Sequence, residues 1–85
     1  MHVIELPEDY AIVLQQVDEI GEEDFTALAE TLRFDRKRLA HIVQALRNKG
    51  LISMTGRGSW IRVSAKGRQL IAYLWPESGM HPSAA

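Results

Sequence analysis

Residues 24–50 read DFTALAETLRFDRKRLAHIVQALRNKG, and this stretch decides the fold. Phe25, Leu28, Ala29 and Leu32 recur at the three-and-four spacing of a short helix, which Asp24 can cap. The segment Arg33-Phe34-Asp35 then interrupts the pattern, and Asp35 can cap a second helix. That helix has an apolar stripe of its own and ends in the cationic, glycine-terminated Asn48-Lys49-Gly50; the stripe is Leu39, Ile42, Val43 and Leu46. Two helices joined by so short a turn form a helix-turn-helix.

The sequence on either side predicts three further elements. Pro7 suits the first turn of a preceding helix that stops at Gly21, with an apolar stripe of Tyr10, Val13, Leu14, Val17 and Ile20. After Gly50 the period becomes extended, and residues 51–55 and 59–63 flank Gly56-Arg57-Gly58, a loop suited to a β-hairpin. Ser64 can cap a last helix that ends before Pro76, with Leu70, Ile71 and Leu74 apolar.

Charge is divided sharply along the chain. Residues 33–68 hold all ten lysines and arginines and one acid, a charge of +9, whereas residues 1–32 hold nine acids and no lysine or arginine, a charge of −9. A one-sign surface of this size attracts a polyanion such as nucleic acid. A solvated basic face without a partner explains the same asymmetry about equally well.

Length and composition exclude several classes of protein. A domain of 85 residues buries only about 60 to 65% of its unfolded surface, which favours binding over an enzyme with a deep cleft. The chain has no cysteine, hence no disulfide or thiolate zinc site, which fits a cytoplasmic protein. Its apolar runs are too short to span a membrane, and we expect no secretory signal, because the first residues lack a basic start and a long apolar stretch. The three histidines are far apart, and no nucleophile or phosphate-loop motif occurs, so we expect no enzymatic activity, cofactor or metal.

Three segments resemble winged helix-turn-helix domains of small MarR-like prokaryotic transcriptional regulators. Residues 28–32, LAETL, are similar to the second-helix motif of that family, and residues 46–52, LRNKGLI, to the exit of its recognition helix. Residues 63–68, VSAKGR, resemble the segment that leaves its wing. The likeness covers about residues 8–75 and keeps the family's order and spacing. It implies an α+β, mostly α fold with a three-helix core, a two-stranded β-hairpin wing and a C-terminal helix.

This sequence departs from the family pattern at two places. The turn usually has a small residue, an aliphatic and a hydroxyl residue, but here it is Arg33-Phe34-Asp35; we expect Phe34 to plug the core and Asp35 to cap. The start of the second helix often offers hydroxyls and amides to a phosphate, whereas Glu22, Glu23 and Asp24 crowd it here with negative charge.

The resemblance implies that residues 36–49 form a recognition helix that enters the DNA major groove. With the apolar stripe turned inward, the outward face and its flanks supply candidate DNA-binding residues: Arg36, Lys37, Arg38, Ala40, His41, Gln44 and Asn48. Cationic side chains can donate to guanine, amides can pair with adenine, and Ala40 leaves room for a thymine methyl. An exposed helix face is normally polar, but this one has no acid after Asp35, which favours DNA.

The wing, about residues 51–63, is expected to lie on the DNA backbone or in the minor groove. Arg57 at its tip suits a narrow minor groove, and Arg62 should point outward to a phosphate while Ile61 and Val63 point inward. Trp60 is expected to pack on the base of the wing, with stacking on sugar or a partner as the alternative. Lys66 and Arg68 open the last helix, where cations oppose the helix dipole and suggest a nearby phosphate.

The sequence therefore predicts one winged helix-turn-helix domain, residues 1–75, with a disordered tail, residues 76–85. Its expected partner is double-stranded DNA, with a possible homodimer through the first and last helices, because Tyr73, Leu74 and Trp75 cannot all face one small core. The acidic first helix should face away from the DNA. Two alternatives stay open: a protein-protein interaction module, and an RNA-binding winged helix that uses the same basic face.

Overall fold

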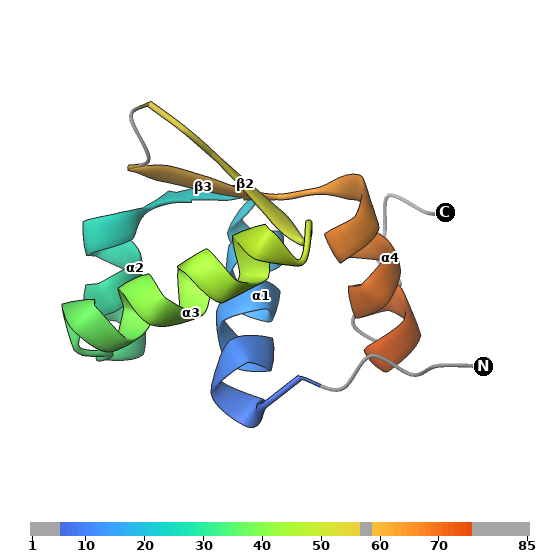
Figure 1. Cartoon of the computed structure of the whole chain (residues 1–85), viewed down its shortest axis with the longest axis horizontal. Coiled ribbons are helices and arrows are strands. Elements are labelled where there is room, and N and C mark those ends of the chain that lie inside the picture. The colour runs from blue at the N-terminus through green and yellow to red at the C-terminus, as the bar shows by residue number, and fades with distance from the viewer. Residues whose placement is uncertain (1–5, 57–58, 76–85) are drawn as a thin grey trace.

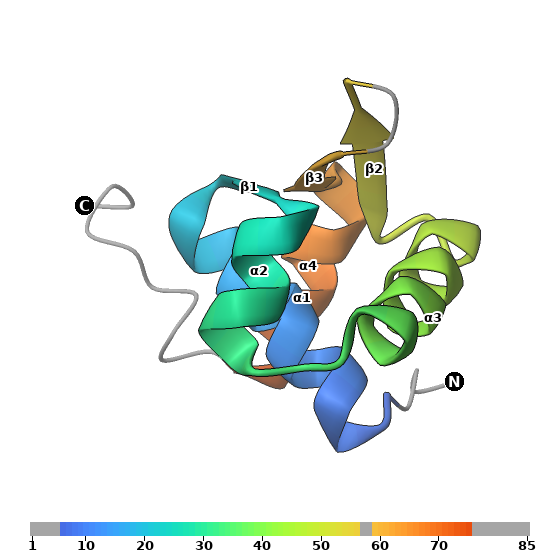
Figure 2. The same cartoon turned by 90° about the vertical axis from the view of Figure 1, so that its left-hand side faces the viewer.

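The computed structural model describes residues 6–56 and 59–75, which form four helices and three short strands (Figure 1). In chain order these are α1 (Glu8–Ile20), β1 (Glu22–Asp24), α2 (Phe25–Leu32), α3 (Arg36–Asn48), β2 (Ile52–Thr55), β3 (Trp60–Val63) and α4 (Ala65–Leu74). Helix α1 lies at the centre, with α2, α3 and α4 around it and the strands at one end (Figures 1 and 2). Arg57 and Gly58 of the predicted hairpin loop lie outside the described residues, as does the predicted disordered tail, residues 76–85.

Three predicted caps begin the helices after α1. The Asp24 carboxylate accepts hydrogen bonds from the backbone N–H groups of Thr26 and Ala27, at 3.0 and 3.2 Å. Asp35 accepts from the N–H of Arg38 at 3.2 Å, and Ser64 Oγ accepts from the N–H of Gly67 at 3.0 Å. These acceptors satisfy amides that a helix leaves unpaired at its start. The helix boundaries could therefore be read from single polar residues.

The turn between α2 and α3 contains a left-handed residue that is not glycine. Arg33 has φ 58° and ψ 39°, and the next N–H, that of Phe34, donates to the carbonyl of Ala29 at 3.0 Å. This geometry closes a helix end but normally selects glycine, because a side chain there costs about 1 kcal/mol. Phe34 packs partly buried against the core, as predicted.

The sheet has three strands, one more than the predicted hairpin. The strand order is β1-β3-β2, both pairings are antiparallel, and β3 is central. Strand β1 consists of Glu22, Glu23 and Asp24, which pair with Arg62, Ile61 and Trp60. Backbone hydrogen bonds therefore join the acidic segment before α2 to the wing. The side chains of this segment did not predict a strand.

The core collects the apolar stripes of all four helices and the inner face of the sheet. Its buried members on α3 are the four predicted residues, and Ile61 and Val63 point inward from the wing as predicted. On α1, Val13, Leu14 and Val17 are buried, but Ile20 is 48% exposed, so its assignment to the buried stripe was wrong. Ile20 is the last residue of α1, where the chain turns at Gly21 into β1 and leaves the core.

Helix α4 packs closely on the junction between α3 and the wing. Gly67 is buried there, and a Cβ atom added to it would meet the backbone carbonyl oxygen of Leu51 and would lie 2.7 Å from Val63 Cγ1. Ser64 strengthens the junction, because its N–H donates to the Leu51 carbonyl at 3.0 Å and its hydroxyl to the Gly50 carbonyl at 2.6 Å. None of the helices within residues 6–56 and 59–75 combines the length and apolar character that a membrane span needs.

Candidate nucleic-acid interface

Helix α3 presents one polar, cationic face to solvent. Its apolar stripe is buried against the rest of the domain, while the residues opposite are exposed: Lys37, Ala40, His41, Gln44 and Asn48. Figure 2 shows the outer side of α3 clear of the other elements, with β2 rising beyond its C-terminal end. The predicted orientation of this helix is therefore confirmed, although its contact with DNA stays a prediction.

Arg36, in the first turn of α3, is held against α2. Its Nη1 donates a hydrogen bond to Thr26 Oγ1 at 3.0 Å, and its guanidinium carbon lies 5.3 Å from the centre of the Phe25 ring. Cation–π contacts of this kind are weak when exposed, but together with the hydrogen bond they favour one side-chain direction. Arg36 thus lies on the α2 flank of the outward face.

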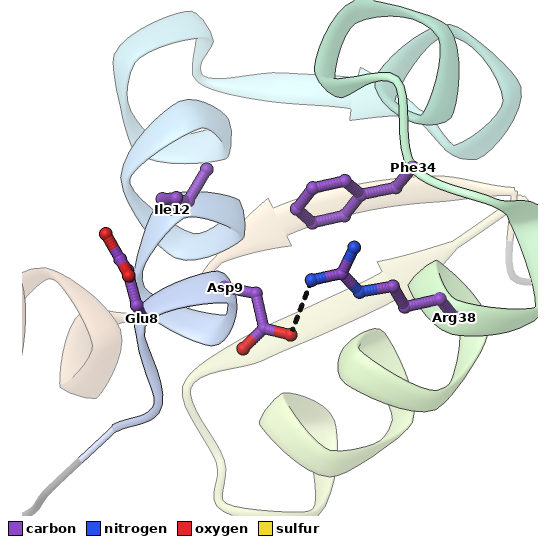
Figure 3. Close-up of a pocket in the computed structure, with 5 residues that line it drawn as sticks. All are labelled: Glu8, Asp9, Ile12, Phe34 and Arg38. Carbon is purple, nitrogen blue, oxygen red and sulfur yellow. Dashed lines mark hydrogen bonds and ion pairs between the residues drawn. The ribbon is translucent and has the colours of Figure 1, made fainter.

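Arg38 is held on the opposite flank, against α1. Its Nη2 lies 3.1 Å from Asp9 Oδ2, and its guanidinium carbon lies 4.4 Å from the centre of the Phe34 ring (Figure 3). The pair borders an open hollow of about 410 Å³ lined by Glu8, Asp9, Ile12, Phe34 and Arg38. The first turn of α1 therefore touches the start of α3, and the expectation that the acidic first helix faces away from DNA stays a prediction. The split of charge along the sequence could not show that its two halves meet here.

Lys37 differs from the two arginines beside it. It is exposed, and within the described part of the chain it has no hydrogen-bond or ion-pair partner. Among the described residues, Lys37 is thus the cation of the first turn of α3 that makes neither the hydrogen bonds nor the ring contacts of Arg36 and Arg38.

Gln44 and Asn48 form a pair on the outward face. Gln44 Nε2 donates to Asn48 Oδ1 at 3.1 Å, one helical turn along. Both side chains are exposed, and the pair leaves the Gln44 carbonyl oxygen and its second N–H available. The spacing of four residues on one helix could have indicated this contact from sequence.

The side chain of Arg62 is exposed on the wing, as predicted. An acidic residue, which was not predicted there, lies beside it. Arg62 stands in the central strand, opposite Ser53 of β2 and Glu22 of β1. Opposite charges at such positions attract one another, although no ion pair joins Glu22 and Arg62 among the described residues. The neighbour comes from the unexpected strand β1.

Trp60, the first residue of β3, is 43% exposed. A Cβ atom at Gly56 would lie 2.8 Å from Trp60 Cδ1, so the indole packs against the backbone at that position. The prediction that Trp60 packs on the base of the wing is therefore wrong: the ring lies against Gly56, outside the core, and much of it stays accessible.

Lys66 bridges to α3 within the domain. Its Nζ donates to the Lys49 carbonyl at 3.1 Å, at the C-terminal end of α3. A cation is favourable at that position because carbonyl groups there lack helical partners. This contact gives Lys66 a structural role that its position in the first turn of α4 did not suggest. Among the residues described, no three His, Cys, Asp or Glu side chains group as a metal site.

Solved structures with the same fold include a DNA-binding regulator. Ligand-free NadR aligns with a TM-score of 0.79 and 21% identity over 94% of this chain and 59% of NadR. NadR in complex with 4-hydroxyphenylacetate aligns with a TM-score of 0.81 and 21% identity over 94% of this chain and 61% of NadR. Bordetella bronchiseptica BpsR, whose DNA binding is regulated by 6-hydroxynicotinic acid, aligns with a TM-score of 0.76 and 16% identity over 84% of this chain and 54% of BpsR.

The chain thus spans less than two thirds of the length of these proteins. No family model and no curated protein matches its sequence. The structural likeness is nevertheless close along nearly the whole domain, and the chain therefore has the winged helix-turn-helix fold of MarR-family regulators.

Proposed function

We propose that this protein binds double-stranded DNA in a sequence-specific manner and regulates transcription, without enzymatic activity. One observation carries the proposal: the exposed face of α3 contains no acid and has cations at both ends of the helix, Arg36, Lys37 and Arg38 in its first turn and Arg47 in its last. In this fold such a helix enters the major groove, while the wing lies on the backbone or in the minor groove. The DNA binding described for BpsR, which shares the fold, supports the same assignment.

The contacts divide into base readers and phosphate ligands. Lys37, His41, Gln44 and Asn48 are the proposed base readers, with Ala40 as the point of close approach. Arg36 and Arg38 on the flanks, with Arg62 on the wing, are proposed to meet phosphates. Arg57 remains a proposed minor-groove residue and Lys66 a proposed phosphate ligand, for which the Lys49 carbonyl is the competing partner.

Salt dependence tests the proposal directly. If about four to six phosphates are neutralised per subunit, log affinity falls with log salt concentration at a slope near −4 to −5 on duplex DNA. The titration should compare random duplex DNA, double-stranded RNA and single strands. Tighter binding to RNA would favour the RNA-binding alternative, and no binding to any of them at low salt would favour a protein partner.

We also propose a homodimer through α1 and α4. Tyr73 on α4 is 56% exposed, and Ile12 and Ile20 on α1 are 40% and 48% exposed, so both helices offer apolar surface. Two-fold pairing would present two recognition helices to a palindromic site. We expect sedimentation at high micromolar concentration to show a dimer, and Tyr73→Ser to shift it toward monomer. A monomer with and without DNA would contradict this proposal.

A further inference from the structure

We propose that Asp9 is a positioning residue that restrains Arg38 and so lowers the affinity of the protein for DNA. The inference rests on the proposed function. It adds that α1, through Asp9, limits the contribution of the first turn of α3 to DNA affinity. Removal of the Asp9 charge should strengthen binding to duplex DNA, although Asp9 is not a proposed DNA ligand.

Both oxygens of the Asp9 carboxylate are engaged. Oδ1 accepts a hydrogen bond from the Tyr10 N–H at 3.0 Å, and Oδ2 lies 3.1 Å from Arg38 Nη2. The first contact favours an orientation of the carboxylate along α1 and so limits how far it can follow Arg38 if the arginine moves. The Asp9 side chain is 29% exposed, which makes it the more enclosed partner of the pair.

Arg38 is the more accessible partner and is held at two points. Its side chain is 53% exposed, and its guanidinium lies over the Phe34 ring while it is paired with Asp9 (Figure 3). It follows Lys37 directly, in the turn of α3 that would meet the edge of the major groove. A long, half-exposed arginine at this position could reach a phosphate, but in this structure its charge is directed to α1 and compensated there.

The ion pair should contribute little to the stability of the fold. A variant that releases Arg38 should therefore still fold, and its DNA affinity can be compared with that of wild type. Exposed ion pairs stabilise proteins only slightly, because water screens them and both side chains lose freedom. Asp9→Asn keeps the size of the side chain and an oxygen that can accept from Tyr10. This substitution should therefore free Arg38 without disturbing the start of α1.

The experiment compares binding of the full chain to a random DNA duplex for wild type and four variants: D9N, R38A, the D9N/R38A double variant and E19Q. Glu19 is exposed at the other end of α1, so Glu19→Gln makes the same charge change far from Arg38. We expect D9N to bind about three- to tenfold more tightly and to steepen the salt slope by about 0.9, the value for one more neutralised phosphate. E19Q should stay within about twofold of wild type. R38A should bind more weakly than wild type, because it removes a proposed phosphate ligand, and the double variant should bind within about twofold of R38A.

The rival explanations give different patterns. If E19Q gains as much as D9N, net charge alone is responsible; if the gain persists in the double variant, Asp9 merely repels phosphate. Weaker binding by D9N would mean that Asp9 orients Arg38 toward DNA. Each of these results, or an unchanged D9N, overturns the inference while wild-type binding still supports the proposed function. Absence of wild-type binding would overturn both.

Discussion

Replacement of Gly67 by alanine should lower the free energy of unfolding by about 3 kcal/mol, and replacement by valine should leave little folded protein. An added Cβ atom would press on the backbone carbonyl of Leu51, which cannot rotate aside, and would lie 2.7 Å from Val63 Cγ1. A domain of this size has only roughly 4 to 13 kcal/mol of stability in total. In an open helix the same change to alanine would instead add about 1 kcal/mol.

Urea denaturation followed by circular dichroism measures this effect, and Gly21→Ala provides the matched control. Gly21 has φ 102° but nothing within 4 Å of an added Cβ atom, so only backbone strain should appear there, about 1 to 2 kcal/mol. A Gly67→Ala variant as stable as wild type would show that α4 does not pack against the Leu51 carbonyl in the way described.

The second large effect is expected on DNA affinity. The double variant K37A/Q44A should bind its selected duplex about 2 to 4 kcal/mol more weakly, roughly 30- to 1000-fold, because two base contacts are removed. Both residues are exposed on the outward face of α3, so the circular dichroism spectrum and stability should stay those of wild type. Selection from a random duplex library supplies the site, and a fluorescence titration measures the loss.

Gln69→Glu controls for charge in this experiment. It lies exposed on α4 and lowers the net charge by one, as Lys37→Ala does. We expect the control to bind within about threefold of wild type. An equal loss in both proteins, or a loss below threefold in K37A/Q44A, would contradict the placement of α3 in the groove. Alanine at Arg36, Lys37 and Arg38 together is a poorer test, because Arg36 and Arg38 also contact α2 and α1.

The helices, their caps and the inward stripe of α3 were predictable because each depends on residues close together in the sequence. Asp24, Asp35 and Ser64 act within three residues of their own positions, and the stripe repeats with the helical period. The orientation of the outward face followed from the same period. Local chemistry was sufficient for these elements.

Contacts between distant residues were not predictable in the same way. Strand β1 is three acidic residues without alternation, and it exists because β3 offers it a backbone edge. Arg38 meets Asp9 across 29 positions, and Lys66 reaches the Lys49 carbonyl across 17. Charge and exposure marked these cations as candidate DNA ligands, but their present partners depend on how the helices pack. Tertiary structure therefore decides which charges of the proposed interface remain uncompensated.

The pairing of β1 with β3 also bears on the order in which the chain can fold. Glu23 lies opposite Ile61, 38 positions later, so this pairing closes a long loop that contains both helices of the helix-turn-helix. The β2–β3 hairpin, in contrast, closes over a few residues and can form early. On a ribosome, residues 22–24 must wait until the last strand has been synthesised. Helices α1, α2 and α3 are synthesised before β3, so the pairing of β1 with β3 can form only after both helices of the helix-turn-helix have been made.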